Sequence, residues 1–305
     1  MRNFLLRLLF VIPAIWLIIT MVFLLIHIVP GDPVEQMLGP DAQASDIAQI
    51  RHDLGLDEPI GVQYGRYLEG IARGDWGASY HFREPVLRLV LERYPATLEL
   101  AIAGLAICIG IAIPAGVFSA NRRGSASDRT TSVLTLFGLS LPNFALGPLL
   151  ILLFSIELGW LPVSGRGGLS HLALPAITLG AALAAILTRM VRGSMLEELS
   201  ADYIRTARAK GLTERAVLFR HALPNALIPI ITIIGLQFGT LLAGTIVTET
   251  IFSWPGIGRL AVQAIESRDY PLLQGCILVI ALSYVLVNLL TDVVYAFVDP
   301  RVRLS

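Results

Sequence analysis

The chain has 305 residues, of which 55% are hydrophobic and 15% are charged. Soluble domains carry about 25% charged residues, so this composition excludes an ordinary soluble domain and indicates several membrane spans. The 23 basic and 23 acidic residues balance, and no nucleic-acid partner is expected. Cys108 and Cys276 lie inside apolar runs, where they are expected to pack as small hydrophobic residues, and no metal site is expected.

Six apolar segments are long enough to cross a bilayer, whose core of about 30 Å requires about 20 apolar residues per helix. The first is longer than the apolar core of a signal peptide and is followed by Pro30, Gly31 and Asp32 instead of a small-residue cleavage site. We therefore interpret it as an uncleaved span and expect an all-α polytopic membrane protein. The six predicted transmembrane helices cover residues 8–29, 97–120, 132–156, 172–190, 226–247 and 273–297.

Basic residues are distributed unevenly around these spans. If the N-terminus is cytoplasmic, most Lys and Arg residues outside the long 30–96 segment fall on the inside, and the short outside loops hold only Arg166, Arg259 and Arg268. The positive-inside rule therefore favours cytoplasmic N- and C-termini. The expected domains are a first transmembrane helix (1–30), an extracytoplasmic cap (31–96), a five-helix core (97–297) containing a cytoplasmic loop (191–225), and a cytoplasmic tail (298–305).

The segment between the first two spans is predicted to form a small cap rather than an independent domain. Apolar residues recur at helical spacing in 44–54 and 61–74, which predicts two short helices. A third predicted helix, 85–98, leads into the second span. The apolar stripe of 61–74 is expected to pack on the rest of the chain.

A basic, helix-rich island lies between the fourth and fifth spans, at residues 199–224. Ser200 is predicted to cap a first helix, and Gly211 fits the left-handed position that ends it. Thr213 is predicted to cap a second helix, which Pro224 would end. Composition alone leaves two interpretations open, a docking surface for a soluble partner and a solvated loop held by anionic headgroups.

Few charged or strongly polar side chains lie within the spans: Glu99, Asn288 and Asp292. Such residues either bond between helices or mark a pathway or gate. The outside loop at 249–271 also leaves two interpretations, because Ser253–Gly256 contains the turn-forming Pro-Gly pair but lies between the last two spans. It is a simple turn, or it is a re-entrant gate or a contact for a binding protein.

The island resembles the EAA loop of ATP-binding-cassette (ABC) importer permeases when Gly211 is aligned with the glycine of that motif. Leu223 and Pro224 then match its Leu-Pro pair, while Arg205, Thr206 and His221 depart from the usual residues. The departures resemble those of the dipeptide/oligopeptide/nickel branch. Further stretches that resemble this branch are 28–33, 74–77, 140–144, 203–212, 219–226, 249–258 and 268–271.

This resemblance implies a type I importer permease in the bacterial inner membrane, with a small periplasmic cap after the first helix. The first helix of the island would be a coupling helix seated in an ATPase subunit. The implied partners are a second permease, two ABC ATPases, an extracytoplasmic substrate-binding protein and membrane lipid. ATP and Mg would be bound by the ATPases, since the chain has no G-x-x-x-x-G-K-[ST] loop and no catalytic constellation. The chain is therefore expected to be a transport subunit and not an enzyme by itself.

The resemblance also assigns site residues. The expected ATPase-coupling interface comprises Tyr203, Arg205, Thr206, Ala207, Arg208, Lys210, Gly211, Leu223 and Pro224. The expected gate or binding-protein contact comprises Glu249, Trp254, Pro255, Gly256, Arg268 and Asp269.

The expected cargo is a dipeptide or oligopeptide, with glutathione, a nickel chelate or another small solute as alternatives. Two other classes of protein compete with the importer. An ion-coupled secondary transporter predicts internal repeats and charged residues at mid-membrane, and neither is prominent in this sequence. A membrane anchor that recruits a soluble protein accounts for the island but not for the small-residue helices or the cap.

Overall fold

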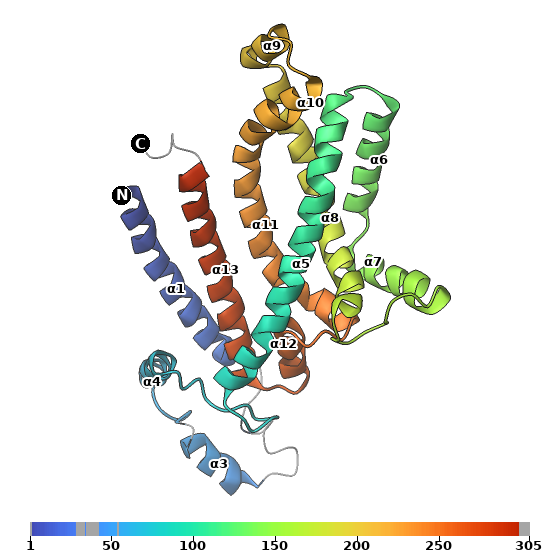
Figure 1. The fold of residues 1–305 in the computed structure, drawn as a ribbon. Helices are drawn as coiled ribbons and strands as arrows, with labels where there is room; N and C mark the ends of the chain where they lie inside the picture. Colours follow the sequence, from blue (N-terminus) through green and yellow to red (C-terminus); the bar gives the residue numbers. More distant parts are fainter. Residues whose placement is uncertain (1, 29–33, 35–42, 54, 299–305) are drawn as a thin grey trace. The chain divides into compact units, whose positions relative to one another are not determined.

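The computed structural model describes residues 2–28, 34, 43–53 and 55–298, and these residues are almost entirely helical (Figure 1). In this part of the chain, β pairing is limited to one isolated antiparallel bridge between Ala78 and Pro85. The elements are α1 (Arg2–Ile28), α3 (Ala44–Asp53), α4 (Ile60–Arg73), α5 (Val86–Asn121), α6 (Ala126–Ser140), α7 (Asn143–Leu150), the π-helix η1 (Ile151–Glu157), α8 (Leu169–Leu199), α9 (Asp202–Ala209), α10 (Glu214–Ala216), the π-helix η2 (Val217–Ala222), α11 (Leu223–Ile251), α12 (Ile257–Glu266) and α13 (Tyr270–Val298).

Among the described residues, four helical stretches are long and apolar enough to cross a membrane: Val86–Asn121, Leu169–Leu199, Glu214–Leu242 and Tyr270–Thr291. They confirm the second, fourth, fifth and sixth predicted spans. Two shorter apolar stretches overlap the other predicted spans: Val11–Leu24 lies within the first, and Phe144–Glu157 covers the second half of the third and ends one residue beyond it. The expected all-α membrane fold is thus confirmed.

The prediction of one continuous helix over 132–156 is wrong. The helix α6 ends at Ser140, and Leu141 and Pro142 are extended, with ψ of 110° and 144°. The physical reason is Pro142, because a proline ring disfavours the helical conformation of the residue before it. The chain then re-enters a helix at α7, which turns away from α6 (Figure 1).

The predicted cap helices are present. The helix α3 matches the predicted 44–54 helix, although residue 54 lies outside the described residues, and α4 matches the predicted 61–74 helix. Gly74 closes α4 in the left-handed conformation, with φ of 78°. The predicted 85–98 helix and the second span form a single helix of 36 residues, α5. The Pro-Gly-Asp-Pro stretch at 30–33 lies outside the described residues.

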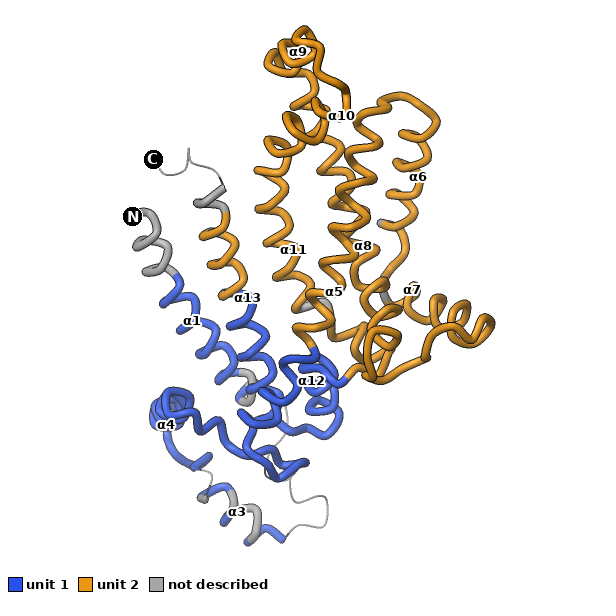
Figure 2. Tube along the Cα trace, in the orientation of Figure 1, with its two compact units in different colours: residues 1–96, 255–285 blue, residues 97–254, 286–305 orange. Residues whose placement is uncertain are grey.

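The chain divides into two compact units (Figure 2). Unit 1 comprises residues 1–96 and 255–285, and unit 2 comprises 97–254 and 286–305. The boundaries cross α5 and α13, so the units interleave along the chain, whereas the domains expected from the sequence are consecutive segments.

Unit 1 is organised around the start of α5, α12 and the start of α13. Their buried residues, among them Val90, Ile257, Leu260 and Cys276, form one apolar cluster. The helix α4 packs on α1 through aromatic rings, since Phe23 lies 5.1 Å from Tyr64 and 5.5 Å from Tyr67 between ring centroids. The apolar stripe of the second cap helix thus packs on the chain itself, as expected.

Unit 2 is organised around a larger apolar cluster. Its buried residues come from α5, α8, α9, η2 and α11. One end of this unit carries α9, α10 and the turn between α5 and α6, and α7 lies at the opposite end (Figures 1 and 2). The end that carries α9 is the position of the predicted coupling surface.

Candidate coupling surface

The first helix of the island is shorter than predicted at its start. Ser200 is not its N-cap, because the Ser200 hydroxyl donates to the carbonyl of Glu197 (2.7 Å) at the end of α8. Ala201 takes the extended N-cap conformation without a side-chain bond. The end of the helix agrees with the prediction, since Gly211 has φ of 77°, a conformation that favours glycine.

The second helix begins as predicted but does not stop at Pro224. The Thr213 hydroxyl accepts from the Ala216 N–H (3.4 Å), which confirms the cap. The helical path then runs through η2 into α11. A π-helix directly before Pro224 widens the turn in which the proline ring would otherwise press on a carbonyl. The Asn225 side-chain amide donates to the carbonyl of His221 (3.0 Å) at this point.

The helix α9 has a buried face and an exposed face. Ile204 is 0% exposed and Ala207 is 7% exposed, and both belong to the apolar cluster of unit 2. The same cluster contains Val191 and Met195 of α8 and Ala226 of α11. Burial of one isoleucine side chain stabilises such packing by about 1.5–3 kcal/mol. A displacement of α9 would therefore disturb an apolar cluster that it shares with η2, α8 and α11.

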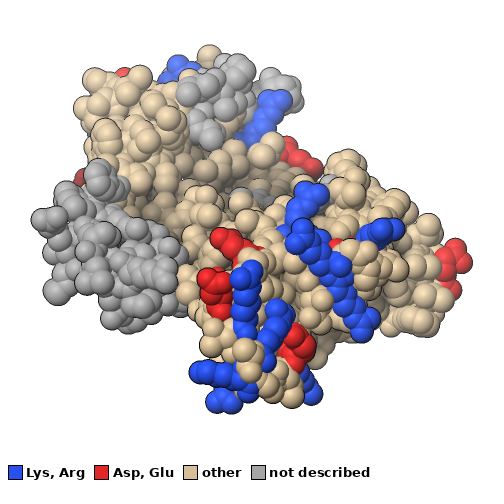
Figure 3. Space-filling model, turned by 90° about the horizontal axis from the view of Figure 1, so that it is seen from above, with Lys and Arg blue, Asp and Glu red and all other residues tan. Residues whose placement is uncertain are grey.

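The exposed face of α9 and the turn that follows it carry most of the predicted interface residues. Tyr203, Arg205, Thr206 and Arg208 are exposed, as are Lys210 and Gly211 beyond the helix. Figure 3 views the molecule from above the position of α9 in Figure 1. Lys and Arg side chains gather on this face, with Asp and Glu side chains among them. Of the remaining predicted residues, Ala207 is buried, Leu223 is half-buried and Pro224 is exposed.

Two exposed arginines of the predicted interface already have acidic neighbours. Arg208 holds Glu214 through Nε (2.7 Å) and Nη2 (3.3 Å), and Arg205 lies 3.3 Å from a carboxylate oxygen of Asp202. Exposed pairs of this kind contribute about 0–1 kcal/mol, so either arginine can exchange its partner at little cost. Charge at this surface is therefore available to a docking protein.

Tyr203 connects three elements at the base of the island. Its hydroxyl donates to the carboxylate of Glu198 at the end of α8 and accepts from the side-chain amide of Asn225 on α11 (3.2 Å). Partial burial, followed by the hydrogen bond to Glu198, raises the pKa of Tyr203. The residue therefore acts as a neutral link at physiological pH.

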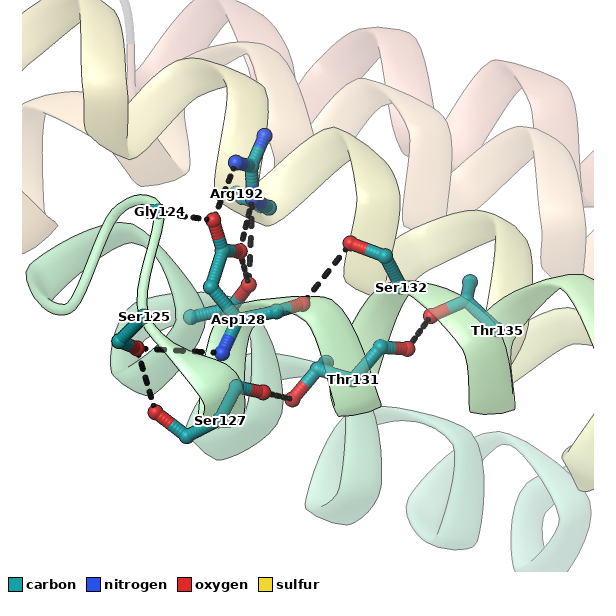
Figure 4. Close-up of polar contacts among 9 residues, drawn as sticks. Gly124, Ser125, Ser127, Asp128, Thr131, Ser132, Thr135 and Arg192 are labelled. Atoms are coloured by element: carbon teal, nitrogen blue, oxygen red, sulfur yellow. Dashed lines mark hydrogen bonds and ion pairs between the residues drawn. The ribbon is translucent and has the colours of Figure 1, made fainter.

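A second polar cluster in unit 2 is centred on Asp128, which was not predicted from the sequence (Figure 4). Both of its carboxylate oxygens accept from Arg192, from Nε at 2.8 Å and from Nη2 at 2.9 Å. The same carboxylate accepts from the Ser119 hydroxyl (2.5 Å) and from the Gly124 N–H (2.9 Å). Asp128 thereby joins the end of α5, the α5–α6 turn and α8.

The surroundings of Asp128 favour its charged form. The Arg192 guanidinium is the main cause of a pKa well below the usual range of a carboxyl group, and the bonds from Ser119 and Gly124 lower it further. The sequence contains a signal for part of this arrangement. Ser125 caps α6 by accepting a hydrogen bond from the Asp128 N–H (3.3 Å), and a Ser followed three positions later by an acidic residue is typical of a capping box. The pairing with Arg192, 64 positions away, has no such signal.

Two of the predicted gate residues, Glu249 and Trp254, lie in unit 2, together with the intramembrane candidate Glu99. Glu99 accepts from Arg166 at 2.9 and 2.5 Å, and the Arg166 guanidinium lies 5.9 Å from the ring centre of Trp254. Glu249 accepts from the Thr97 hydroxyl (2.7 Å). Glu249 and Trp254 are both fully buried, so neither side chain is available to a soluble protein in this conformation.

The other gate residues lie in unit 1. Pro255 is half-buried, and Gly256 is the N-cap of α12, a helix that the sequence analysis did not predict. Asp269 is buried and accepts from the Ser79 hydroxyl (2.5 Å) and from the N–H groups of His81 and Leu272. It therefore ties the cap to the start of α13, while the neighbouring Arg268 is exposed. A gate or contact role for this group stays a prediction.

The remaining intramembrane candidate with a described side chain is Asn288 on α13. Its amide oxygen is buried and has no hydrogen-bond partner among the described residues. The side chain of Asp292 lies outside the described residues. No group of three or more His, Cys, Asp or Glu residues that could hold a metal is found in the described part of the chain.

Comparison with known families decides the class of this chain. Residues 112–304 match the family of binding-protein-dependent transport system inner membrane components, and residues 1–101 match the N-terminal family of the same membrane components. The chain belongs to this family. It is the permease component of an ABC importer of the peptide/nickel branch. Membership of this family implies ATPase and substrate-binding partners. It also fits a multi-pass protein of the inner membrane.

Two relatives match over nearly the full length of the chain. The Glutathione transport system permease protein GsiC of Salmonella paratyphi A is 45% identical over 306 aligned positions, covering 99% of each chain. The protein of the same name from Escherichia coli strain K12 is 45% identical and covers 97% of each chain.

Two solved structures share the fold. Both are inward-facing forms of the MetNI methionine ABC transporter, with TM-scores of 0.57 and 0.59 and identities of 20% and 21%. They cover 70% and 69% of this chain and 97% and 96% of their own. These likenesses, together with the family, establish the type I permease fold.

Proposed function

We propose that this chain translocates glutathione or peptides of similar size across the bacterial inner membrane. The observation that supports this cargo most directly is the 45% identity, over nearly the whole length, to permeases named for glutathione transport. Glutathione is a tripeptide, so it also falls within the peptide class that the branch motifs imply. Dipeptides and longer oligopeptides are the second candidate cargo.

In the proposed mechanism, α9 is the coupling helix. Its exposed face, with Arg205, Thr206 and Arg208, docks on an ATPase subunit, and Gly211 allows close approach of the partner. Its buried face passes the displacement to α8 and α11 through Ile204 and Ala207. The mechanism is supported by the burial of one face of an eight-residue helix whose other face is polar and exposed.

The proposed complex contains this chain, a second permease, two ABC ATPases and an extracytoplasmic binding protein. ATP and Mg are bound by the ATPases, and this chain performs no hydrolysis itself. The proposed orientation places α9, the N-terminus and the C-terminus in the cytoplasm, in agreement with the distribution of basic residues.

The test is purification of the tagged chain from its native membrane, reconstitution of the recovered complex with its binding protein, and measurement of radiolabelled glutathione uptake. We expect ATP-dependent uptake that excess unlabelled glutathione abolishes. Uptake of dipeptides without uptake of glutathione would contradict the cargo and leave the permease function intact. Recovery of the chain without any ATPase in mild detergent, together with ATP-independent uptake, would contradict the importer mechanism.

A further inference from the structure

Three arginines at the α5–α6 turn have a different environment from those of the coupling surface. Arg122 and Arg123 directly follow α5, and Arg129 lies in the first turns of α6. All three are exposed. Within the described part of the chain, none of them takes part in an ion pair. By contrast, Arg205 and Arg208 of the coupling surface are both paired.

The acidic residue nearest to these arginines in the sequence is already paired with another arginine. Asp128 is the only acidic residue between Glu99 and Glu157, and Arg192 engages both of its carboxylate oxygens (Figure 4). Asp128 is only 5% exposed, so it adds little negative potential at the surface. The turn therefore presents three guanidinium groups whose charge the chain itself does not neutralise.

Each helix beside the turn continues from an arginine into an exposed apolar stripe. On α6, Val133, Leu136 and Phe137 follow Arg129 at helical spacing, and all three are exposed. On α5, Ile111 and Phe118 precede Arg122 at helical spacing and are exposed as well. The Arg122 guanidinium lies 4.7 Å from the ring centre of Phe118. Cationic groups therefore stand at the ends of two apolar stripes.

We propose that this turn binds the headgroup of an anionic phospholipid. The α5 span ends at Asn121, so the arginines lie where a membrane-spanning helix leaves the hydrocarbon. A phosphodiester matches the bidentate geometry of guanidinium groups, and the acyl chains cover the apolar stripes below. Because the stripes continue directly from the arginines, one phospholipid can place its headgroup at the turn and its acyl chains along the helices, and we therefore favour lipid as the occupant.

This proposal rests on the membrane-spanning fold and not on the proposed cargo. Its test is native mass spectrometry of the full-length chain in detergent with equal amounts of phosphatidylglycerol and phosphatidylcholine of the same acyl composition. The wild-type chain should retain phosphatidylglycerol preferentially. The R122Q/R123Q/R129Q variant should lose most of this preference, since one surface-facing arginine changes anionic-lipid binding by about fivefold.

Two matched variants test whether a loss of lipid preference is due to lost charge, to misfolding, or to the removal of cations anywhere on the chain. R122K/R123K/R129K keeps the positive charge and should keep most of the lipid preference. R205Q/R208Q/K210Q removes three cations from the coupling surface and should keep the full preference while weakening co-purification of the ATPase. An unchanged lipid ratio in R122Q/R123Q/R129Q would overturn the proposal. Loss of ATPase co-purification in that variant, with the lipid ratio unchanged, would assign the turn to a protein partner instead.

Discussion

At the scale of single residues, Gly211 combines a left-handed backbone conformation with a place on the proposed docking surface. Its φ of 77° strains any residue with a side chain by about 1–2 kcal/mol, and asparagine tolerates this conformation best. Apart from its two chain neighbours, a Cβ atom placed there meets no atom of the described residues within 4 Å. A side chain at this position is therefore opposed by backbone strain and, in the proposed complex, by the docked ATPase, but not by packing within the chain.

The substitutions Gly211→Asn and Gly211→Trp separate these two effects. We expect Gly211→Asn to retain most of the ATPase co-purification, because it accepts the left-handed conformation and is small. We expect Gly211→Trp to abolish co-purification while the chain still inserts in the membrane. Gly211→Ala controls for strain without bulk, and equal losses in the Ala and Trp variants would show that backbone strain alone is responsible.

At the scale of elements, the sequence predicted the apolar helices well, because hydrophobic length depends on local composition. The two prolines show where local rules conflict. Pro142 ends the helical path by acting on Leu141, whereas the path continues past Pro224, which follows a π-helix. Periodicity alone does not distinguish these outcomes, because they depend on whether the preceding turn can widen.

The Asp128–Arg192 pair was missed because it depends on how α6 and α8 pack, which spacing along the chain does not encode.

Replacement of Asp128 by asparagine tests whether this pair holds α6 to α8. Asp128→Asn leaves Arg192 without its carboxylate partner and should lower the free energy of unfolding by about 1–3 kcal/mol at pH 7. Thermal melts of the detergent-solubilised chain, with Arg205→Gln as an exposed-pair control, measure the difference. A loss no larger than that of the control would show that the pair contributes little.

The pH dependence of the same difference follows from the lowered pKa of Asp128. A carboxyl group with a lower pKa in the folded state stabilises the fold fully above its unfolded pKa of about 3.9, and the contribution falls as pH decreases toward the folded value. The gap between wild type and Asp128→Asn should therefore be constant from about pH 5.5 to 8 and shrink below about pH 4. A gap that grows on acidification would contradict this assignment.

At the scale of the whole molecule, the proposed mechanism requires that ATP-driven movement of α9 reach the long helices. We assign this connection to Ile204, because it is fully buried in an apolar cluster shared with residues of α8, η2 and α11, while the proposed docking face of α9 is exposed. Docking and transmission are therefore assigned to different faces of one short helix. The sequence motif predicts the docking face, whereas the burial of Ile204 depends on the tertiary packing and has no signal along the chain.

Ile204→Ala removes the transmitting contact and leaves the docking face unchanged. The cavity should cost about 2–4 kcal/mol of local packing, so the complex should still assemble while less of the movement of α9 reaches α8 and α11. We expect ATPase co-purification to be retained, hydrolysis to stay within about twofold, and glutathione transported per ATP to fall several-fold. Ile156→Ala makes the same chemical change at an exposed position of η1 and should leave that ratio unchanged. If hydrolysis and transport instead fall in proportion, Ile204 contributes only to the yield of folded complex. The movement of the ATPases would then reach the transmembrane helices through another contact.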